Sequence, residues 1–157
     1  MSSDQAPTDQ ARADQAPTDQ PPTPQVWPTL RAEDAPALIT FLKRAFGFEE
    51  TVVYAEDDVV HHAELAWPEG GGIMLGSARP SDGDEWPLRP GSFGAYVVTA
   101  HTDEIFARAK AAGAEIIKEP FDTDYGSRDF QARDCEGNRW SFGSYPGQPR
   151  RDGLRTG

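Results

Sequence analysis

His62 and Glu64 are the residues of this chain whose types and spacing best suit acid–base chemistry. They lie two apart, so a strand would place both side chains on the same face. A histidine near a carboxylate can serve as a general base, and the pair could also hold a metal ion. The alternative is a polar network with Arg139 or with solvent. His61 is adjacent, and without a bulge it is expected on the other face.

Other reactive groups are less well placed. Cys135 is the only cysteine, and it lies between Asp134 and Glu136, whose charges are expected to raise the pKa of its thiol. A single cysteine allows no internal disulfide and cannot make a structural zinc site, which favours a cytoplasmic protein. The glycines at 70–72 precede a strand instead of opening a helix, so they fail the context test for a phosphate-binding loop.

The elements that would position these residues follow a Pro-rich leader. Ala37–Phe46 carries the apolar spacing of an amphipathic helix, with Asp34 as its N-cap and Gly47 closing it. Strands are predicted around this helix, at 26–31, 49–55, 59–67 and 71–77. Residues 78–90 are rich in proline and turn residues and are predicted to be a linker.

The same order of elements then restarts. After a strand at 93–99, a helix capped by Thr102 or Asp103 is predicted to run to about Ala112, and strands follow at 114–118, 129–133 and 139–144. The segments Ile73–Ser77 and Trp140–Ser144 match at a spacing of 67 residues. Two copies of one unit predict an α+β domain of two βαβββ modules, with a ligand cleft between them.

Strand alternation assigns side chains to the two faces of the predicted sheets. Leu65, Trp67 and Ile73 are expected under a helix, whereas Gly72, Gly76 and Gly143 on the opposite face leave room for a ligand cup. The predicted ligand-binding residues lie toward this cup or in loops beside it: Trp27, His62, Glu64, Met74, Trp86, Tyr96, Tyr125, Arg139 and Ser141. Aromatic faces bind flat or amphipathic ligands, and the alternative is that these aromatic residues fill the core.

Composition excludes several partners. Residues 1–25 repeat Asp-Gln-Ala-Pro-Thr-Asp-Gln and are predicted to be a disordered tail that is not a signal peptide, and residues 146–157 a second flexible tail. The net charge is −11. A fold this acidic predicts no nucleic-acid partner and no anionic membrane surface as a partner, and no apolar run is long enough to cross a membrane.

The paired modules and two motifs resemble the vicinal oxygen chelate superfamily, in its glyoxalase and bleomycin-resistance-protein branch. The resemblance spans about 27–145. It rests on the helix end Phe46-Gly47-Phe48-Glu49, on the loop Asp124–Arg128, and on Asp134-Cys135-Glu136-Gly137-Asn138, where the family typically has Asp-Pro-x-Gly-Asn. It implies that modules at about 26–79 and 91–145 form a cup-shaped mixed sheet with helices on the outer face.

The resemblance also allows a test for a metal centre. Metalloenzymes of this superfamily hold a divalent metal with side chains from the first and fourth strands of each module. The matching positions here are Trp27, Met74, Gly94 and Ser141. This set supplies one weak hydroxyl, whereas a hard divalent cation needs oxygen or imidazole ligands, so neither a metal nor another cofactor is expected.

Members of the superfamily without the metal set are often ligand-binding proteins, by the same resemblance. Bleomycin-resistance-type proteins sequester an antibiotic in grooves between modules and subunits, commonly as dimers. The chain is therefore expected to be a homodimeric, metal-independent binder of an aromatic small molecule such as an antibiotic. A different class is also open: a lyase or isomerase that uses His62 and Glu64, with or without a divalent metal. A regulatory module is a third option.

Overall fold

A computed structural model describes residues 23–80 and 83–149, so most of both predicted tails lies outside the described residues. The first module comprises β1 (Thr29–Ala32), α2 (Ala35–Phe41), the π-helical turn η1 (Leu42–Phe46), β2 (Glu49–Glu56), β3 (Val59–Ala66) and β4 (Gly72–Ser77). The second comprises β5 (Gly94–Val98), α3 (Thr102–Ala111), β6 (Glu115–Asp122), β7 (Arg128–Arg133) and β8 (Arg139–Gly143). Each module has the predicted βαβββ order.

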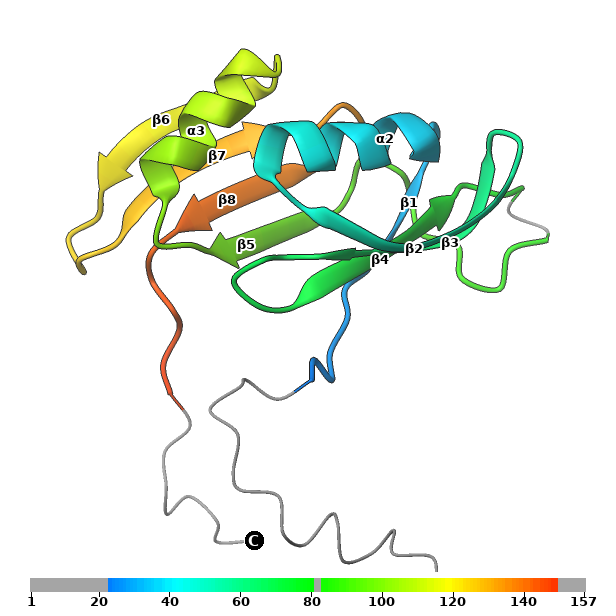
Figure 1. Ribbon diagram of the computed structural model, residues 1–157, viewed down its shortest axis with the longest axis horizontal. Helices are drawn as coiled ribbons and strands as arrows, with labels where there is room; N and C mark the ends of the chain where they lie inside the picture. The colour runs from blue at the N-terminus through cyan, green and yellow to red at the C-terminus, as the bar shows by residue number, and fades with distance from the viewer. Residues whose placement is uncertain (1–22, 81–82, 150–157) are drawn as a thin grey trace, which may run out of the picture.

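The strands form two four-stranded mixed sheets, ordered β1-β4-β3-β2 and β5-β8-β7-β6. In each sheet the first strand runs parallel to the last, and the other neighbours are antiparallel. The two helices lie side by side on the same side of the molecule, and the terminal segments leave on the opposite side (Figure 1). Each sheet is therefore covered on one face and open on the other. None of the helices in the described part has the length and apolar character that a membrane crossing needs.

The internal repeat extends to irregularities of the backbone. Glu49–Glu56 and Glu115–Asp122 begin and end 66 residues apart, and each strand has a register shift at the equivalent place, Glu50/Val52 and Ile116/Lys118. Gly72 and Arg139, which begin the last strands, lie 67 apart. The second module therefore gains one residue after β6, where the β6–β7 connection is longer than the β2–β3 turn.

The ends of the helices show which local predictions hold. Asp34 caps α2 as expected, because its carboxylate accepts from the amide of Ala37 at 3.1 Å. The predicted capping of α3 by Thr102 or Asp103 is wrong. The N-cap position is His101, and the hydroxyl of Thr102 instead donates to the carbonyl of Arg128 at 2.8 Å. That contact ties the start of α3 to β7.

One aromatic core joins the two modules. Phe46 of the first module contacts Trp140 and Phe142 of the second, with ring centroids 5.6 and 4.7 Å apart. Phe48 lies 5.5 Å from Trp140, and Trp67 lies 5.8 Å from Phe142. All five rings are less than a tenth exposed. Since such pairs add about 0.5–1.5 kcal/mol each beyond area burial, these contacts stabilise the packing of one module against the other.

Charged residues of the second module also hold both ends of the first module's helix. At its start, the Glu136 carboxylate accepts from the amides of Glu33 and Asp34 at 2.7 and 3.0 Å. At its end, the Arg108 guanidinium donates to the carbonyls of Arg44 and Lys43 at 2.8 and 2.9 Å. A helix start attracts negative charge and a helix end positive charge. We call these four contacts the helix clasp, and they fix the orientation of one module against the other.

We predict that Glu136→Gln lowers the free energy of unfolding by about 1–2 kcal/mol, because a neutral amide weakens two charge-assisted bonds at a helix start. Urea unfolding of the purified variants measures this. Glu115→Gln is the matched control, since Glu115 makes only a 3.8 Å surface ion pair with Arg133, for which about 0.5 kcal/mol or less is expected. Equal losses in the two variants would show that the clasp adds no stability.

Candidate functional site

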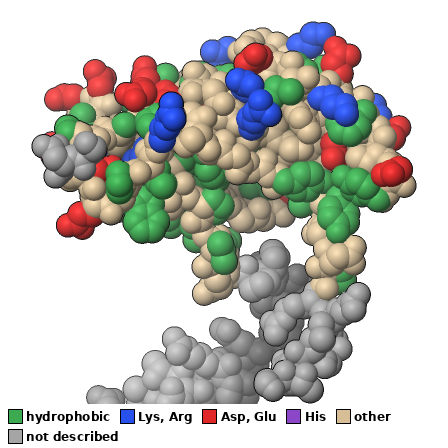
Figure 2. All heavy atoms as spheres, turned by 180° about the vertical axis from the view of Figure 1, so that it is seen from behind, with side chains coloured by type: hydrophobic (Ala, Val, Ile, Leu, Met, Phe, Trp, Pro, Cys, Tyr) green, Lys and Arg blue, Asp and Glu red, His purple; other side chains and the backbone are tan. Residues whose placement is uncertain are grey.

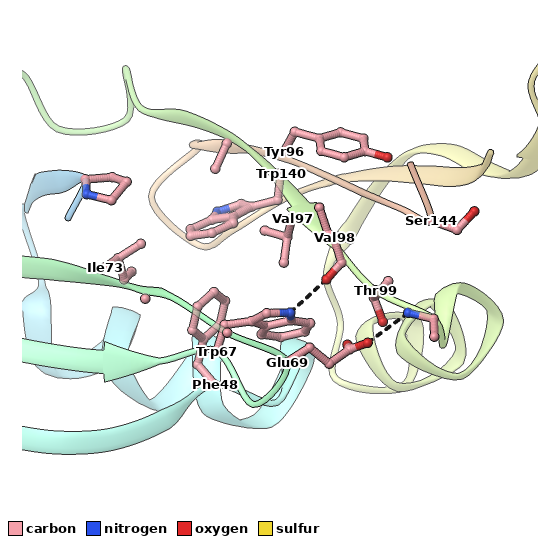
Figure 3. Close-up of a pocket in the computed structure, with 15 residues that line it drawn as sticks. Phe48, Trp67, Glu69, Ile73, Tyr96, Val97, Val98, Thr99, Trp140 and Ser144 are labelled. Atoms are coloured by element: carbon pink, nitrogen blue, oxygen red, sulfur yellow. Dashed lines mark hydrogen bonds between the residues drawn. The ribbon is translucent and has the colours of Figure 1, made fainter. Parts of the chain in front are cut away.

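A cavity of about 480 Å³ opens between the two modules, where the sequence repeat predicts a cleft. We call it the inter-module cavity. Its lining includes Phe48, Trp67, Glu69 and Ile73 from the first module, and Tyr96, Val97, Val98, Trp140 and Ser144 from the second (Figure 3). The walls are thus aromatic and aliphatic side chains from both copies of the repeat.

One wall of the inter-module cavity is formed by β5, which is an edge strand of its sheet. The amide of Thr99 and the carbonyl of Phe93 pair with β8, so the backbone groups of Val98 and Ala100 point to the free edge. The indole of Trp67 donates to the carbonyl of Val98 at 2.9 Å, and the amide of Ala100 donates to the Glu69 carboxylate at 2.8 Å (Figure 3). These two bonds bridge the modules and set the separation of the cavity walls.

The inter-module cavity has a simple charge pattern. Glu69 is the one charged residue among the described residues that line it. The other polar side chains there are Tyr96, Thr99 and Ser144, besides Trp67 and Trp140, whose indoles are already hydrogen-bonded. Mostly apolar pockets with a few placed polar groups are typical of small-molecule sites. The lining suits a flat apolar ligand that is neutral or carries a positive group.

Tyr96 is positioned by a small polar network that sequence reasoning missed. Its hydroxyl accepts from the amide of Tyr145 at 3.0 Å and lies 3.4 Å from the hydroxyl of Ser127, which also donates to the buried carboxylate of Asp129. A side chain at Gly143 would collide with Asp129 and with the Tyr96 hydroxyl. Strand alternation places Gly143 on the open face. The structure gives the reason for a glycine there, because this polar cluster fills the space that a side chain would need.

A second pocket, of about 280 Å³, lies on the open face of the first sheet. We call it the Arg31 pocket. It is lined by Thr29, Leu30, Arg31, His61, His62, Met74, Leu75, Gly76, Arg79 and Trp86. The linker between the modules forms one wall, because the Trp86 indole donates to the Thr29 hydroxyl at 3.0 Å and the Arg31 guanidinium pairs with Asp84 at 2.9 Å.

His62 and Glu64 form the pair that the sequence predicts on one face of a strand. Nε2 of His62 lies 2.9 Å from Oε2 of Glu64, and the ring of Tyr54 is stacked 6.4 Å from the imidazole. Arg139 lies on β8 of the other sheet, and no contact joins it to the pair among the described residues. The expected network with Arg139 is therefore not formed.

His61 does not follow the side-chain alternation that the sequence predicts for this strand. Tyr54 pairs with His62 and Ala55 with Val60, so His61 is the extra residue of a β-bulge. A bulge interrupts the alternation of side chains along a strand and re-aims them. Both histidines consequently line the Arg31 pocket, although alternation alone places them on opposite faces.

The family's metal positions do not fit a divalent cation in this chain. Met74 lies opposite Thr29, and Ser141 lies opposite Tyr96. Trp27 precedes β1, and Gly94 carries no side chain. Hydroxyl and thioether groups are poor ligands for such ions. Within residues 23–80 and 83–149 no group of three His, Cys, Asp or Glu side chains is placed to hold a metal ion.

The nine predicted ligand-binding residues are divided among several places. Tyr96 lines the inter-module cavity, and His62, Met74 and Trp86 line the Arg31 pocket. The remaining five, Trp27, Glu64, Tyr125, Arg139 and Ser141, belong to neither lining. Trp27 packs over Gly72, whose added Cβ would lie 2.7 Å from its ring, and Tyr125 packs against Tyr145.

Sequence reasoning missed the lining residues Trp67, Phe48, Glu69, Arg31 and Arg79. Strand alternation correctly places Trp67 on the helix-covered face. That face also borders the gap between the sheets, which a single-sheet pattern does not reveal. The sequence could have indicated Arg31 as an open-face residue. It is a charged residue within a short strand, and it lies between the buried Leu30 and Ala32.

Cys135 lies on the helix side, beside Arg44 and Ala112 in a shallow hollow. Partial burial raises the pKa of its thiol to about 11, and the charges of Asp134 and Glu136 act in the same direction. The sequence predicted this direction from the two charges, whereas burial is the larger cause. At neutral pH the side chain is a thiol and a poor nucleophile.

Comparisons with known proteins agree with this architecture. Residues 24–142 match the family model of the Glyoxalase/Bleomycin resistance protein/Dioxygenase superfamily. A search of curated proteins found no match. Because the family model matches most of the chain, the chain belongs to this superfamily.

Solved structures of similar fold include TioX from Micromonospora sp. ML1, at 28% identity and a TM-score of 0.61, with 73% of this chain and 93% of TioX covered. A superfamily member from Sphaerobacter thermophilus DSM 20745 is 22% identical, with a TM-score of 0.57 and 73% and 91% covered. A glyoxalase-related enzyme from Fulvimarina pelagi is 17% identical, with a TM-score of 0.59 and 80% and 91% covered. The last two likenesses concern the fold alone.

We predict that iodoacetamide labels Cys135 slowly near neutral pH and that the rate rises as the pH approaches about 11, because only the thiolate reacts. Mass spectrometry of timed samples measures the rate. The urea-unfolded chain is the control, and its rate should level off nearer the ordinary thiol pKa of about 8.5. A folded-state rate that levels off at the same pH as the unfolded one would contradict the assignment.

Proposed function

We propose that this protein binds an aromatic small molecule, such as an antibiotic, in the inter-module cavity without a metal ion. The observation that carries the proposal is the cavity itself. Its walls come from both modules and include Trp67, Phe48, Trp140 and Tyr96. Aromatic walls offer large apolar contact to a flat ligand, and Glu69 can pair with a positive group on it.

The donor set at the family's metal positions supports a binder over a metalloenzyme. The superfamily contains both kinds of protein, so membership alone does not choose between them. In this chain the paired open-face residues are Met74 with Thr29 and Ser141 with Tyr96. Binding and sequestration need no metal, and the aromatic cavity requires none for its shape.

The proposal includes a homodimer in the cytoplasm whose ligand-binding unit is the segment 26–145. Several large apolar side chains outside both pocket linings are exposed, among them Val53, Val59, Leu88 and Ile117. Hydrophobic side chains also gather on the side where the terminal segments emerge (Figure 2). Exposed apolar patches mark interaction surfaces, and a second copy of the chain would cover them.

The second candidate is a lyase or isomerase that uses His62 and Glu64. The 2.9 Å contact between Nε2 and Oε2 favours it, because a carboxylate that orients an imidazole is the usual arrangement of a general base. The His62→Ala variant distinguishes the enzyme candidate from the binding protein. Any turnover by this mechanism disappears in His62→Ala, whereas binding in the inter-module cavity is unaffected by that change.

We predict that the protein binds Nile red, a flat neutral dye, and that Tyr96→Ala weakens this binding about fivefold, since an aromatic contact contributes about 1 kcal/mol. Dye fluorescence in a titration measures the dissociation constant, and bleomycin can be tested as a displacing antibiotic. Tyr54→Ala is the matched control, because Tyr54 is exposed but does not line the cavity. Unchanged binding in Tyr96→Ala would remove the cavity assignment.

A further inference from the structure

The inter-module cavity combines exposed apolar surface with a carboxylate. Tyr96 and Val98, which line it, are 42% and 40% exposed. The Glu69 carboxylate accepts from the amide of Ala100, and within residues 23–80 and 83–149 it has no Lys, Arg or His partner. We propose that the chain's own segment 150–155 docks in this cavity and that a ligand must displace it. This inference rests on the proposed function, because it concerns the regulation of the same site.

The segment has the composition that complements this lining. Three arginines at 150, 151 and 155 stand there against one acidic residue, Asp152, so its side chains carry a charge of +2 in a chain whose net charge is −11. Leu154 is the one large apolar side chain beyond Tyr145. A guanidinium suits pairing with a carboxylate, and a leucine side chain gains from burial against apolar walls. One arginine and one leucine can therefore meet both features of the cavity.

The chain leaves the second sheet beside the carboxylate. Ser144, the residue that follows β8, lines the cavity. The amide of Thr99 donates to the carbonyl of Gly143 at 2.8 Å, and the next amide, that of Ala100, donates to Glu69 at 2.8 Å. Ser144, Thr99 and Glu69 consequently lie at one end of the cavity (Figure 3). The part of the chain that continues from β8 therefore starts at the charged end of this site.

Tyr145 is fixed at this exit. Its amide donates to the hydroxyls of Tyr96 and Ser127, each at 3.0 Å, and its ring packs edge-on against Tyr125 at 5.6 Å between centroids. The residues from 146 to 154 can span at most about 30 Å when fully extended. That length is enough for Leu154 to return to a cavity whose rim is the starting point of the segment.

The tether makes weak contacts sufficient for docking. A short flexible linker gives a tethered group an effective concentration of about a millimolar, so a segment with a dissociation constant near that value occupies its site about half the time. The apparent affinity for a ligand falls in proportion to the fraction of chains whose cavity is free. The segment therefore sets a threshold for the ligand without preventing binding.

Limited digestion of the full chain with trypsin tests the docking without any ligand. Trypsin cleaves after Arg150 and Arg151, and mass spectrometry of timed samples gives the rate. A docked segment is protected, because the protease needs an extended and accessible chain. We expect Leu154→Ser and Glu69→Gln each to raise the cleavage rate about twofold or more, since each removes one of the two contacts that hold the segment.

Two matched variants and one internal reference control the digestion. Thr156→Ser changes the same segment without altering its charge or apolar content. Glu119→Gln removes an exposed carboxylate on β6, outside both pocket linings. Both should be cleaved at the rate of the parent. Cleavage after Arg12, in the other terminal segment, should have the same rate in all five proteins. Equal rates in the parent and in Leu154→Ser would overturn the inference.

Titration with Nile red separates this inference from the proposed function. The dye should bind Leu154→Ser about twofold more tightly than the parent, because a larger fraction of cavities is free. Bound dye should also raise the parent's cleavage rate to that of Leu154→Ser. Protection that bound dye leaves in place would overturn the inference, since the segment would then dock elsewhere. If no variant binds the dye, the proposed function fails, and the cleavage rates of Leu154→Ser and Glu69→Gln still decide the docking.

Discussion

The helix clasp is the contact on which the arrangement of this protein depends. Glu136 and Arg108 hold opposite ends of the first module's helix from within the second module, and each charge has the sign that its helix end favours. Beneath the helix, aromatic side chains of both modules pack into one shared core. Two copies of a βαβββ unit, each open on one face, thereby become one body with a fixed gap between its sheets.

The molecule has two pockets of different character, one between the modules and one on the open face of the first sheet. Bonds from Trp67 and Glu69 to the free edge of β5 hold the inter-module cavity open, and its lining is apolar with one carboxylate. The linker that joins the modules is held against the open face of the first sheet by Arg31 and Trp86, where it completes a pocket lined by arginine and histidine.

Much of the fold follows from the sequence, because alternation, helix caps and the 67-residue repeat are local signals. Gly47 and Asp34 mark the ends of the first helix, and both modules have the predicted order of elements. The site was harder to predict. Glu69, on the loop after β3, gains a role only from an edge strand 31 residues further on, and His61 is redirected by a bulge whose position no residue pattern marks. Trp67 was correctly placed on the covered face, but the gap between the sheets depends on how the modules pack.

We propose that this chain works without the metal centre that enzymes of its superfamily carry. Calorimetric titration of chelator-treated protein with Ni²⁺, Zn²⁺ and Mn²⁺, together with elemental analysis of protein purified without chelator, tests it most directly. We expect no stoichiometric metal and no binding heat at the ordinary pH of purification. One tightly bound ion per chain would contradict it and would make His62 and Glu64 the first residues to substitute.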